Sequence, residues 1–203
     1  MRMSGEQFNE QYKNKTFVKL TRKNEIHNGF EFKTGLNIDF IEFNPTGQCK
    51  AGGLYFTDID IMYKWLHYND EYMEWMRFVT IPMDAQIYVE DSKFKCDKFI
   101  LSEREEIAFK DNIQMMNAIK QSYMALRYVK EQTPELCLYA IQQDCWALQF
   151  VKEQTDDLCK IAIKKSGSAL QFVNNQTYEM CKIAVSYCKV ALQFVRNKDF
   201  KFD

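Results

Sequence analysis

Residues 147–168 read ALQFVKEQTDDLCKIAIKKSGS, and similar stretches recur along the second half of the chain. The first five letters stand at 147–151, 169–173 and 191–195, and the similar ALRYV stands at 125–129, so the interval is constant. The part between them repeats as well, with a threonine, a Leu-Cys or Met-Cys pair and an Ala-Ile or Ala-Val pair in each copy. A fixed period of this kind indicates an architecture in which each unit buries its apolar face against its neighbours.

Each repeat predicts a pair of helices. Thr155 stands where a helix N-cap is expected, and Asp156 and Asp157 follow in the first turn, where the helix dipole favours acidic side chains. The next apolar residues share one face of that helix, and they are Leu158, Cys159, Ala162 and Ile163. A break at Gly167 and Ser168 leads into a second helix with Ala-Leu and Phe-Val pairs. The pattern therefore predicts 22-residue helical hairpins that stack into an α-solenoid over residues 104–203.

The cysteines of the repeats raise the question of a metal site. Cys137, Cys159 and Cys181 occupy the same position in successive repeats. Zinc-bound sulfurs lie ~2.3 Å from the ion, whereas equivalent helices of stacked units lie ~8–10 Å apart, so this column cannot converge on one ion. We therefore predict no metal site and interpret these cysteines as small apolar residues in a buried seam. We expect all seven cysteines of the chain to be reduced thiols.

One position of the repeat is polar within an otherwise apolar segment. It holds Gln149, Gln171 and Gln193, with Arg127 in the first copy. Two interpretations stay open. The column can recognise a partner along one face of the repeats, or it can be a solvated position that duplication of the repeat has copied. These four residues are the candidates for partner binding.

The first half of the chain has a different pattern, with short runs in which apolar and polar residues alternate. The runs lie at 30–32, 36–40, 54–56, 75–81, 87–89 and 99–101. Such runs favour strands, whereas the apolar residues at 61, 62, 65 and 66, which follow Thr57 and Asp58, favour one helix. We predict a polar segment over residues 1–16 and an α+β domain over 17–103 with a small, mostly antiparallel sheet. The whole chain is thus predicted to be α+β.

Composition excludes several classes of protein. Of the 203 residues 46% are hydrophobic, which is enough for a buried core. The 27 basic and 28 acidic side chains give a net charge of −1, which argues against a nucleic-acid partner. No apolar run approaches the ~18 residues of a membrane span, and the polar start of the chain is unlike a secretory signal. We therefore expect neither a membrane partner nor secretion.

The repeats resemble the short helical repeats of proteins from giant amoebal viruses, in which units reading ALQFVKEQT-x-x-LC-x-x-AI occur in tandem. The resemblance covers about residues 113–197. It implies a viral origin. It also implies that the protein acts in the cytoplasm of the infected host cell or in the virus factory.

A second resemblance concerns the first domain. His27, in Ile-His-Asn-Gly, and Tyr55, in Gly-Leu-Tyr-Phe-Thr ahead of a helix, are similar to residues of the His-Tyr-Glu type of ADP-ribosyltransferase. In that family the His holds the adenosine ribose of NAD, the Tyr stacks on nicotinamide and a Glu polarises the ribose. The resemblance implies NAD as a cofactor at His27 and Tyr55. Glu90 and Asp97 are the nearest acidic candidates, and neither stands in a matching motif.

We therefore expect a non-enzymatic scaffold protein without a cofactor, whose helical repeats recognise a viral or host protein. The alternative is an ADP-ribosyltransferase-like or nucleotide-binding first domain, with NAD at His27 and Tyr55 and the repeats as a targeting arm. Catalysis is not expected, because the sequence offers no carboxylate in the motif where transferase chemistry needs one.

Overall fold

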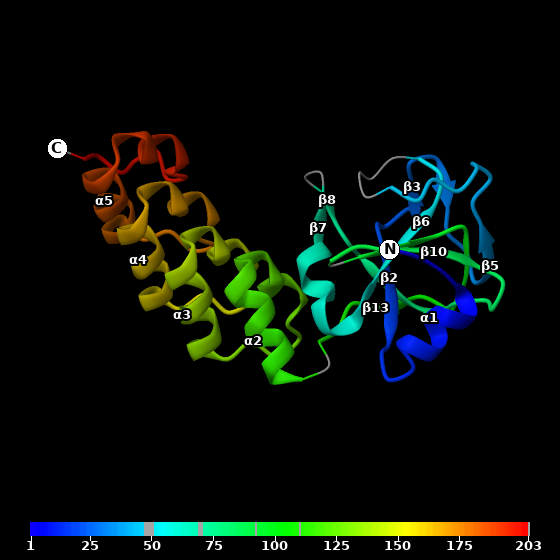
Figure 1. The fold of residues 1–203 in the computed structure, drawn as a ribbon. Helices are drawn as coiled ribbons and strands as arrows, with labels where there is room; N and C mark the ends of the chain where they lie inside the picture. The colour runs from blue at the N-terminus through cyan, green and yellow to red at the C-terminus, as the bar shows by residue number, and fades with distance from the viewer. Residues whose placement is uncertain (47–50, 69–70, 92, 110, 203) are drawn as a thin grey trace. The chain divides into compact units, whose positions relative to one another are not determined.

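The computed structural model of the chain describes residues 1–46, 51–68, 71–91, 93–109 and 111–202 (Figure 1). The chain forms two compact units, Met1–Ile107 and Ala108–Asp203. Strands dominate the first unit and helices the second. No helix among the described residues has the length and apolar character that crossing a membrane requires.

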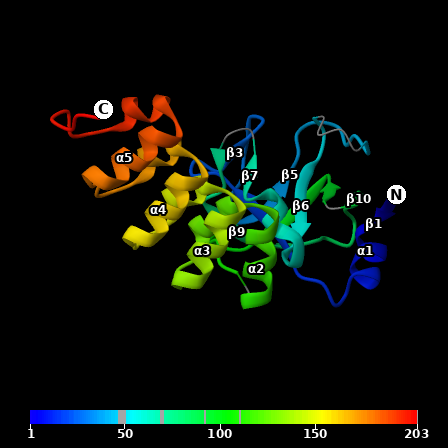
Figure 2. The ribbon, with the colours of Figure 1, turned by 90° about the vertical axis from the view of Figure 1, so that its left-hand side faces the viewer.

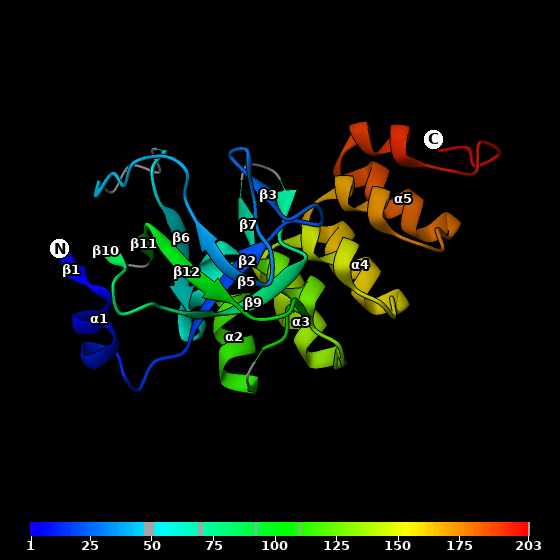
Figure 3. The ribbon, with the colours of Figure 1, turned by 90° about the vertical axis from the view of Figure 1, so that its right-hand side faces the viewer.

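The first unit is built on strands. They are β1 (Arg2–Ser4), β2 (Phe17–Thr21), β3 (Ile26–His27), β4 (Phe30–Glu31), β5 (Gly35–Ile38), β6 (Leu54–Asp58), β7 (His67–Tyr68), β8 (Glu71–Tyr72), β9 (Trp75–Thr80), β10 (Gln86–Val89), β11 (Phe94–Cys96), β12 (Lys98–Leu101) and β13 (Glu105–Glu106). The α-helix α1 (Gly5–Gln11) and the 3-10 helix η1 (Ile59–Trp65) accompany them. Nine strands form one antiparallel sheet in the order β1-β10-β11-β6-β2-β9-β12-β5, with β13 paired to β9 (Figure 3). The ladders β3-β4 and β7-β8 lie outside it.

The prediction of a small sheet is wrong, since the sheet has nine strands. β2 carries a lysine in the middle of an apolar run, and β1 and β11 have only three residues each, so alternation alone does not reveal them. Pairing with neighbours defines these strands instead. β2 joins β6 to β9, with Val18 opposite Phe78, and β11 joins β10 to β6, with Phe94 opposite Phe56.

Residues 1–16, which we predicted as a polar segment ahead of the domain, contain elements of the first unit. β1 pairs with β10, and Ser4 caps α1 in a capping box with Gln7. Phe8 of α1 is buried, and the centre of its ring lies 4.9 Å from that of Phe17 and 5.4 Å from that of Phe94. α1 therefore packs onto the aromatic core of the sheet.

Strand β2 is buried on both faces. Phe17 and Lys19 point to one side and Val18 and Leu20 to the other, because successive side chains of a strand alternate. The aromatic core on the side of Phe17 also contains Phe8, Phe32, Leu54, Phe56, Val79, Ile81, Ala85, Ile87, Phe94, Cys96, Phe99 and Leu101. Lys19 thus stands in an apolar layer, where a charged side chain is costly.

The second unit alternates α-helices with short 3-10 helices. In chain order they are α2 (Asn112–Gln121), η2 (Tyr123–Tyr128), α3 (Pro134–Gln143), η3 (Cys145–Phe150), α4 (Asp156–Lys165), η4 (Gly167–Phe172), α5 (Tyr178–Tyr187) and η5 (Lys189–Phe194). From α3 onward the α-helices begin at the period of the repeat, at Pro134, Asp156 and Tyr178. Consecutive α-helices pack side by side, and so do consecutive 3-10 helices (Figure 1 and Figure 2).

The prediction of an α-solenoid built from 22-residue helical hairpins is wrong. The second element of each repeat is a 3-10 helix of six residues, bounded by extended residues on both sides. Around η4, for example, Ser166 has φ −153° and ψ 123°, and Val173 has φ −72° and ψ 120°. Six residues between two extended ones can form a few i to i+3 hydrogen bonds, but they are too few for a stable α-helix.

A column of glutamines joins each repeat to the next. It consists of Gln132, Gln154 and Gln176, which we call the bridging glutamines. The Nε2 of Gln154 donates to the carbonyl oxygens of Leu148 and Phe172, at 3.1 and 2.9 Å. Its Oε1 accepts from the backbone N–H of Asn174 at 2.9 Å. Gln132 and Gln176 make the equivalent bonds in their own repeats.

The repeat cysteines belong to this bridge. The thiols of Cys137, Cys159 and Cys181 each donate to the Oε1 of a bridging glutamine at 3.7 Å. All three cysteines are buried. In the part of the chain that the structure describes, no group of three or more His, Cys, Asp or Glu side chains is arranged to hold a metal ion.

The thiols of the repeat cysteines should react slowly in the folded chain. Burial is the main cause that raises the pKa of Cys159 to about 11, so little reactive thiolate exists near neutral pH. We expect iodoacetamide to modify Cys137, Cys159 and Cys181 at least about tenfold more slowly than half-exposed Cys188. Mass spectrometry of peptides after timed alkylation measures the rates, with the urea-unfolded chain as reference. Equal rates for all four cysteines in the folded chain would contradict the buried seam.

Candidate functional site

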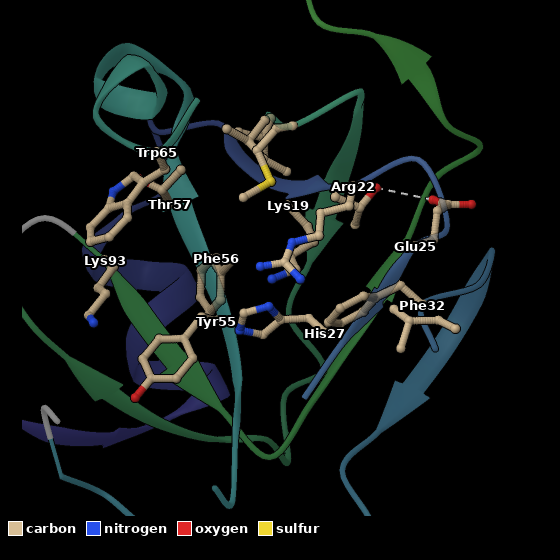
Figure 4. Close-up of a pocket in the computed structure, with 15 residues that line it drawn as sticks. Lys19, Arg22, Glu25, His27, Phe32, Tyr55, Phe56, Thr57, Trp65 and Lys93 are labelled. Atoms are coloured by element: carbon tan, nitrogen blue, oxygen red, sulfur yellow. Dashed lines mark hydrogen bonds between the residues drawn. The ribbon is translucent and has the colours of Figure 1, made fainter. Parts of the chain in front are cut away.

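The first unit contains a pocket that combines cationic side chains with aromatic rings (Figure 4). The cavity of this pocket has a volume of about 90 Å³. The lining residues are Val18, Lys19, Leu20, Thr21, Arg22, Glu25, Ile26, His27, Phe32, Tyr55, Phe56, Thr57, Trp65, Met73 and Lys93. They come from β2, β3, β6, η1 and the connecting loops, so segments far apart in the sequence meet here.

Lys19 is the least expected side chain of the pocket. It is only 8% exposed, and its partner across the β2-β9 pair is Arg77, so two cations stand opposite each other in the sheet. Its Nζ lies 4.5 Å from the centre of the Phe32 ring, and no carboxylate or hydrogen-bond acceptor among the described residues pairs with it. Burial is the main cause that lowers the pKa of Lys19 to about 8, and the charge of Arg22 contributes.

Arg22 and His27 lie close to this lysine. Figure 4 shows the guanidinium of Arg22 and the imidazole of His27 pointing into the same part of the pocket. Burial, followed by the charges of Lys19 and Arg22, lowers the pKa of His27 to about 4, so the imidazole is neutral near pH 7. Nε of Arg22 lies 2.5 Å from Oε2 of Glu71 in an ion pair.

The other side of the pocket is aromatic. Tyr55 comes from β6 and Trp65 from η1, and Figure 4 shows both on the side away from Glu25. The Nζ of Lys93 lies 4.7 Å from the centre of the Tyr55 ring and 5.3 Å from that of the Trp65 ring. Lys93 also pairs with Glu90 at 3.6 Å. These cation–π contacts fix a further positive charge at the rim of the pocket.

Glu25 carries the only carboxylate among the described lining residues. Hydrogen bonds from neighbouring side chains fix the position of this carboxylate. Nε and Nη2 of Arg77, which is 4% exposed, donate to the two carboxylate oxygens at 2.7 and 2.9 Å. Thr21 Oγ1 adds a hydrogen bond at 3.2 Å, the dashed line in Figure 4. The hydrogen bonds from Arg77 hold the pKa of Glu25 below its usual range. Glu25 also has a left-handed φ of 55°, a costly conformation that its surroundings must enforce.

The structure brings His27 and Tyr55 into the same pocket. The acidic candidates of the sequence lie elsewhere. Neither Glu90 nor Asp97 is among the described residues that line it. Glu90 pairs with Lys93, and Asp97 accepts a hydrogen bond from the backbone N–H of Gln86 at 2.8 Å.

The cations of the pocket were not among the candidates predicted from the sequence. The available signal was the lysine within the run Phe-Val-Lys-Leu-Thr, because a charged side chain in a buried strand often marks a functional site. Arg22 and Lys93 lie in connecting segments, where basic residues are ordinary, and only the folded chain brings them to Lys19 and Tyr55.

The four partner-binding candidates lie in the second unit, each at the fifth position of a 3-10 helix. They are Arg127 in η2, Gln149 in η3, Gln171 in η4 and Gln193 in η5. Gln171 is half-buried and the other three are exposed. Because consecutive 3-10 helices pack side by side, these positions form a row, which we call the polar row. The side-chain amides of Gln149 and Gln171 donate to backbone carbonyls three residues earlier, at 3.0 Å.

Trp146 adds an aromatic side chain beside the polar row. The amide of Gln149 donates to the carbonyl oxygen of Trp146. Trp146 itself is 43% exposed. The indole packs against the ring of Phe172 in the next repeat in an edge-to-face contact, with 5.0 Å between the ring centroids. Exposed tryptophan held in place is typical of surfaces that bind proteins.

Comparison with protein families concerns the repeats. The family described as "Domain of unknown function (DUF4116)" matches residues 133–176. This span begins at Thr133, the N-cap of α3, and ends at Gln176, directly before the N-cap of α5. It therefore contains two successive repeats. No solved structure matches the chain.

The similar curated proteins come from Acanthamoeba polyphaga mimivirus. "Putative ankyrin repeat protein R868" is 39% identical over 84 residues, which are 40% of this chain and 40% of that protein. "Uncharacterized protein R869" is 38% identical over 72 residues, or 34% and 49%. "Putative ankyrin repeat protein R896" is 28% identical over 136 residues, or 56% and 40%. The chain thus spans less than half the length of these relatives, and the similarity supports an origin in a giant amoebal virus.

The repeats of this chain differ in length from ankyrin repeats. The α-helices α3, α4 and α5 begin at Pro134, Asp156 and Tyr178, so each repeat is clearly shorter than an ankyrin repeat. An ankyrin repeat has about 33 residues and pairs two α-helices with a β-turn. The likeness to proteins with ankyrin names therefore does not make these helices ankyrin repeats.

Proposed function

We propose that the second unit recognises a protein partner and that the polar row, together with Trp146, is the contact surface. The observation that carries the proposal is that polar side chains, three exposed and one half-buried, occupy the same position of successive repeats. Repeats that hold side chains in a row present an extended surface suited to another protein. Two of the mimivirus relatives are named for ankyrin repeats, a class of repeat that forms such surfaces, and this supports the same class of function.

The bridging glutamines support the proposal because they make the row rigid. Each of them bonds to backbone atoms of two successive repeats, which limits movement of one repeat relative to the next. A surface that is already ordered loses less entropy when it binds. The proposed partner is a viral or host protein, and we place the encounter in the cytoplasm of the infected host cell or in the virus factory. The similarity to mimivirus proteins supports this location.

Adding negative charge to the polar row should strongly reduce partner binding. We expect the combined variant Gln149→Glu, Gln171→Glu and Gln193→Glu to recover at least about tenfold less partner, because three carboxylates are added at one contact surface. The measurement is quantitative mass spectrometry of proteins that co-purify with the full chain from infected amoebae.

The matched control adds the same charge elsewhere on the helices. Gln121, Gln142 and Gln143 are exposed residues at the ends of α2 and α3, outside the polar row. Their combined change to Glu should leave partner recovery within about twofold of the wild type. Equal loss in both triple variants, or no loss in either, would rule out the polar row as the contact surface.

The transferase alternative has one observation in its favour, since His27 and Tyr55 line one pocket. The charges of that pocket oppose the chemistry. ADP-ribosyl transfer develops positive charge at the ribose, and the pocket offers Lys19, Arg22 and Lys93 but no carboxylate free of an ion pair among the described residues. We therefore propose a binding role for this pocket and no enzymatic role.

A further inference from the structure

We propose that the pocket of the first unit binds the phosphate group of a small phosphate monoester, with Lys19, Arg22 and His27 as the phosphate-binding side chains. This site is separate from the polar row, since all of its described lining residues belong to the first unit. Its test can therefore fail without affecting the proposed partner surface.

The charge of the pocket suits an anion. Among the described lining residues, three are cations, Lys19, Arg22 and Lys93, and one is a carboxylate, Glu25, so positive charge predominates. Arg22 pairs with Glu71 and Lys93 with Glu90, whereas Glu25 pairs with Arg77 and Arg104. A phosphate monoester carries nearly two negative charges at neutral pH.

Lys19 points most directly to an anion. A buried ammonium without a counter-ion is expensive, and proteins keep such groups where a ligand supplies the missing charge or where chemistry needs them. With a pKa of about 8, Lys19 is mainly protonated at pH 7. An anion in the pocket would stabilise this charged form, and Lys19 would then have a counter-charge, as Arg77 has in Glu25.

The neighbours of Lys19 complete a phosphate-binding set. The guanidinium of Arg22 presents planar N–H donors that suit phosphate oxygens. The imidazole of His27 is neutral and carries one ring N–H, and Figure 4 shows it on the same side as Arg22. These three side chains would supply charge and hydrogen bonds from different directions, as a tetrahedral anion requires.

The size of the pocket limits the ligand. A cavity of about 150 Å³ holds a benzene molecule, whereas the cavity of this pocket has about 90 Å³. It therefore has room for a phosphate group but not for a large organic group as well. Tyr55 and Trp65 line the pocket with aromatic surface, so an ester whose planar organic group contacts these rings should bind more tightly than inorganic phosphate.

Calorimetric titration of the full chain at pH 7 and constant ionic strength tests the site with phenyl phosphate, inorganic phosphate, benzoate and NAD as probes. We expect phenyl phosphate to bind at least about tenfold more tightly than inorganic phosphate, and both to bind more tightly than benzoate. Binding of NAD without binding of phenyl phosphate would overturn the proposal in favour of a dinucleotide site. Equal binding of benzoate and phenyl phosphate, or no binding of any probe, would also overturn it.

Two variants separate a ligand-binding lysine from a structural one. Lys19→Met should weaken phenyl phosphate binding at least about 20-fold, yet it should raise the melting temperature of the unliganded chain, because it removes an unpaired buried charge. Lys23→Met removes the same charge at an exposed position near the pocket, and it should change the affinity less than about twofold. A lower melting temperature for Lys19→Met, or unchanged phenyl phosphate affinity, would contradict the proposal.

Discussion

Replacing Gln154 with alanine should lower the free energy of unfolding of the second unit by about 3–5 kcal/mol. The change leaves the carbonyl oxygens of Leu148 and Phe172 without their side-chain donor and the N–H of Asn174 without its acceptor. The bonds to the two carbonyl oxygens are partly buried, and a backbone group that loses its partner away from water costs about 1–3 kcal/mol, whereas the N–H of Asn174 is exposed and adds less. The loss is large because one side chain serves two repeats.

Gln149→Ala is the matched control for this prediction. Gln149 is exposed, and within the described part of the chain its amide donates only to the carbonyl oxygen of Trp146 in its own 3-10 helix. Its replacement should cost less than about 1 kcal/mol. Urea unfolding followed by circular dichroism measures both variants. Similar losses at the two positions would mean that the bridging glutamines do not hold the repeats together.

Replacing Glu25 with alanine should lower the stability of the first unit by about 3–5 kcal/mol at neutral pH. Arg77 then keeps its charge in a buried place but loses the two hydrogen bonds that Glu25 accepts. An uncompensated buried charge is among the largest single penalties that a substitution can cause.

Glu31→Ala is the control, because Glu31 is an exposed carboxylate on β4, and its replacement should cost less than about 0.5 kcal/mol.

The effect of Glu25→Ala should also depend on pH. Since the pKa of Glu25 is lowered in the folded chain, its contribution is complete above the unfolded value of about 4.3 and is lost as the pH falls through the folded value. Urea unfolding at neutral and acid pH should show the difference between wild type and variant shrinking in acid, and a constant difference would contradict the ion pair.

The repeat period was the most informative part of the sequence. Spacing and N-caps place α3, α4 and α5, and the threonines at 133, 155 and 177 accept the capping hydrogen bonds. The 3-10 helices could not be predicted, because the ALQFV segment has apolar pairs that fit a short α-helix equally well. The segment forms a 3-10 helix and not an α-helix because only six residues lie between two extended ones. That number depends on how neighbouring repeats pack.

The two glutamine columns show a limit of repeat analysis. Gln149 and Gln154 both recur with the period of the repeat, so periodicity treats them alike. Only the contacts distinguish them, since Gln154 bonds to two repeats whereas Gln149 faces outward. The sequence therefore identified a polar column but could not separate a surface position from a structural one.

The pocket could be predicted in part. The resemblance to transferases drew attention to His27 and Tyr55, which the structure places in one pocket. The cations that define its chemistry come from segments with no shared motif. Lys19 is buried because β2 lies between β6 and β9, and that position follows from strand pairing across distant parts of the chain.

Site-specific photocrosslinking tests the proposed partner surface most directly. The full chain, produced in infected amoebae with p-benzoylphenylalanine in place of Gln149, should form a covalent adduct with a discrete protein on irradiation, as should the chain with the crosslinker in place of Gln193. The same crosslinker in place of Gln142, an exposed residue outside the polar row, should give no such adduct. An adduct from position 142 and none from positions 149 and 193 would contradict the assignment of the polar row as the contact surface.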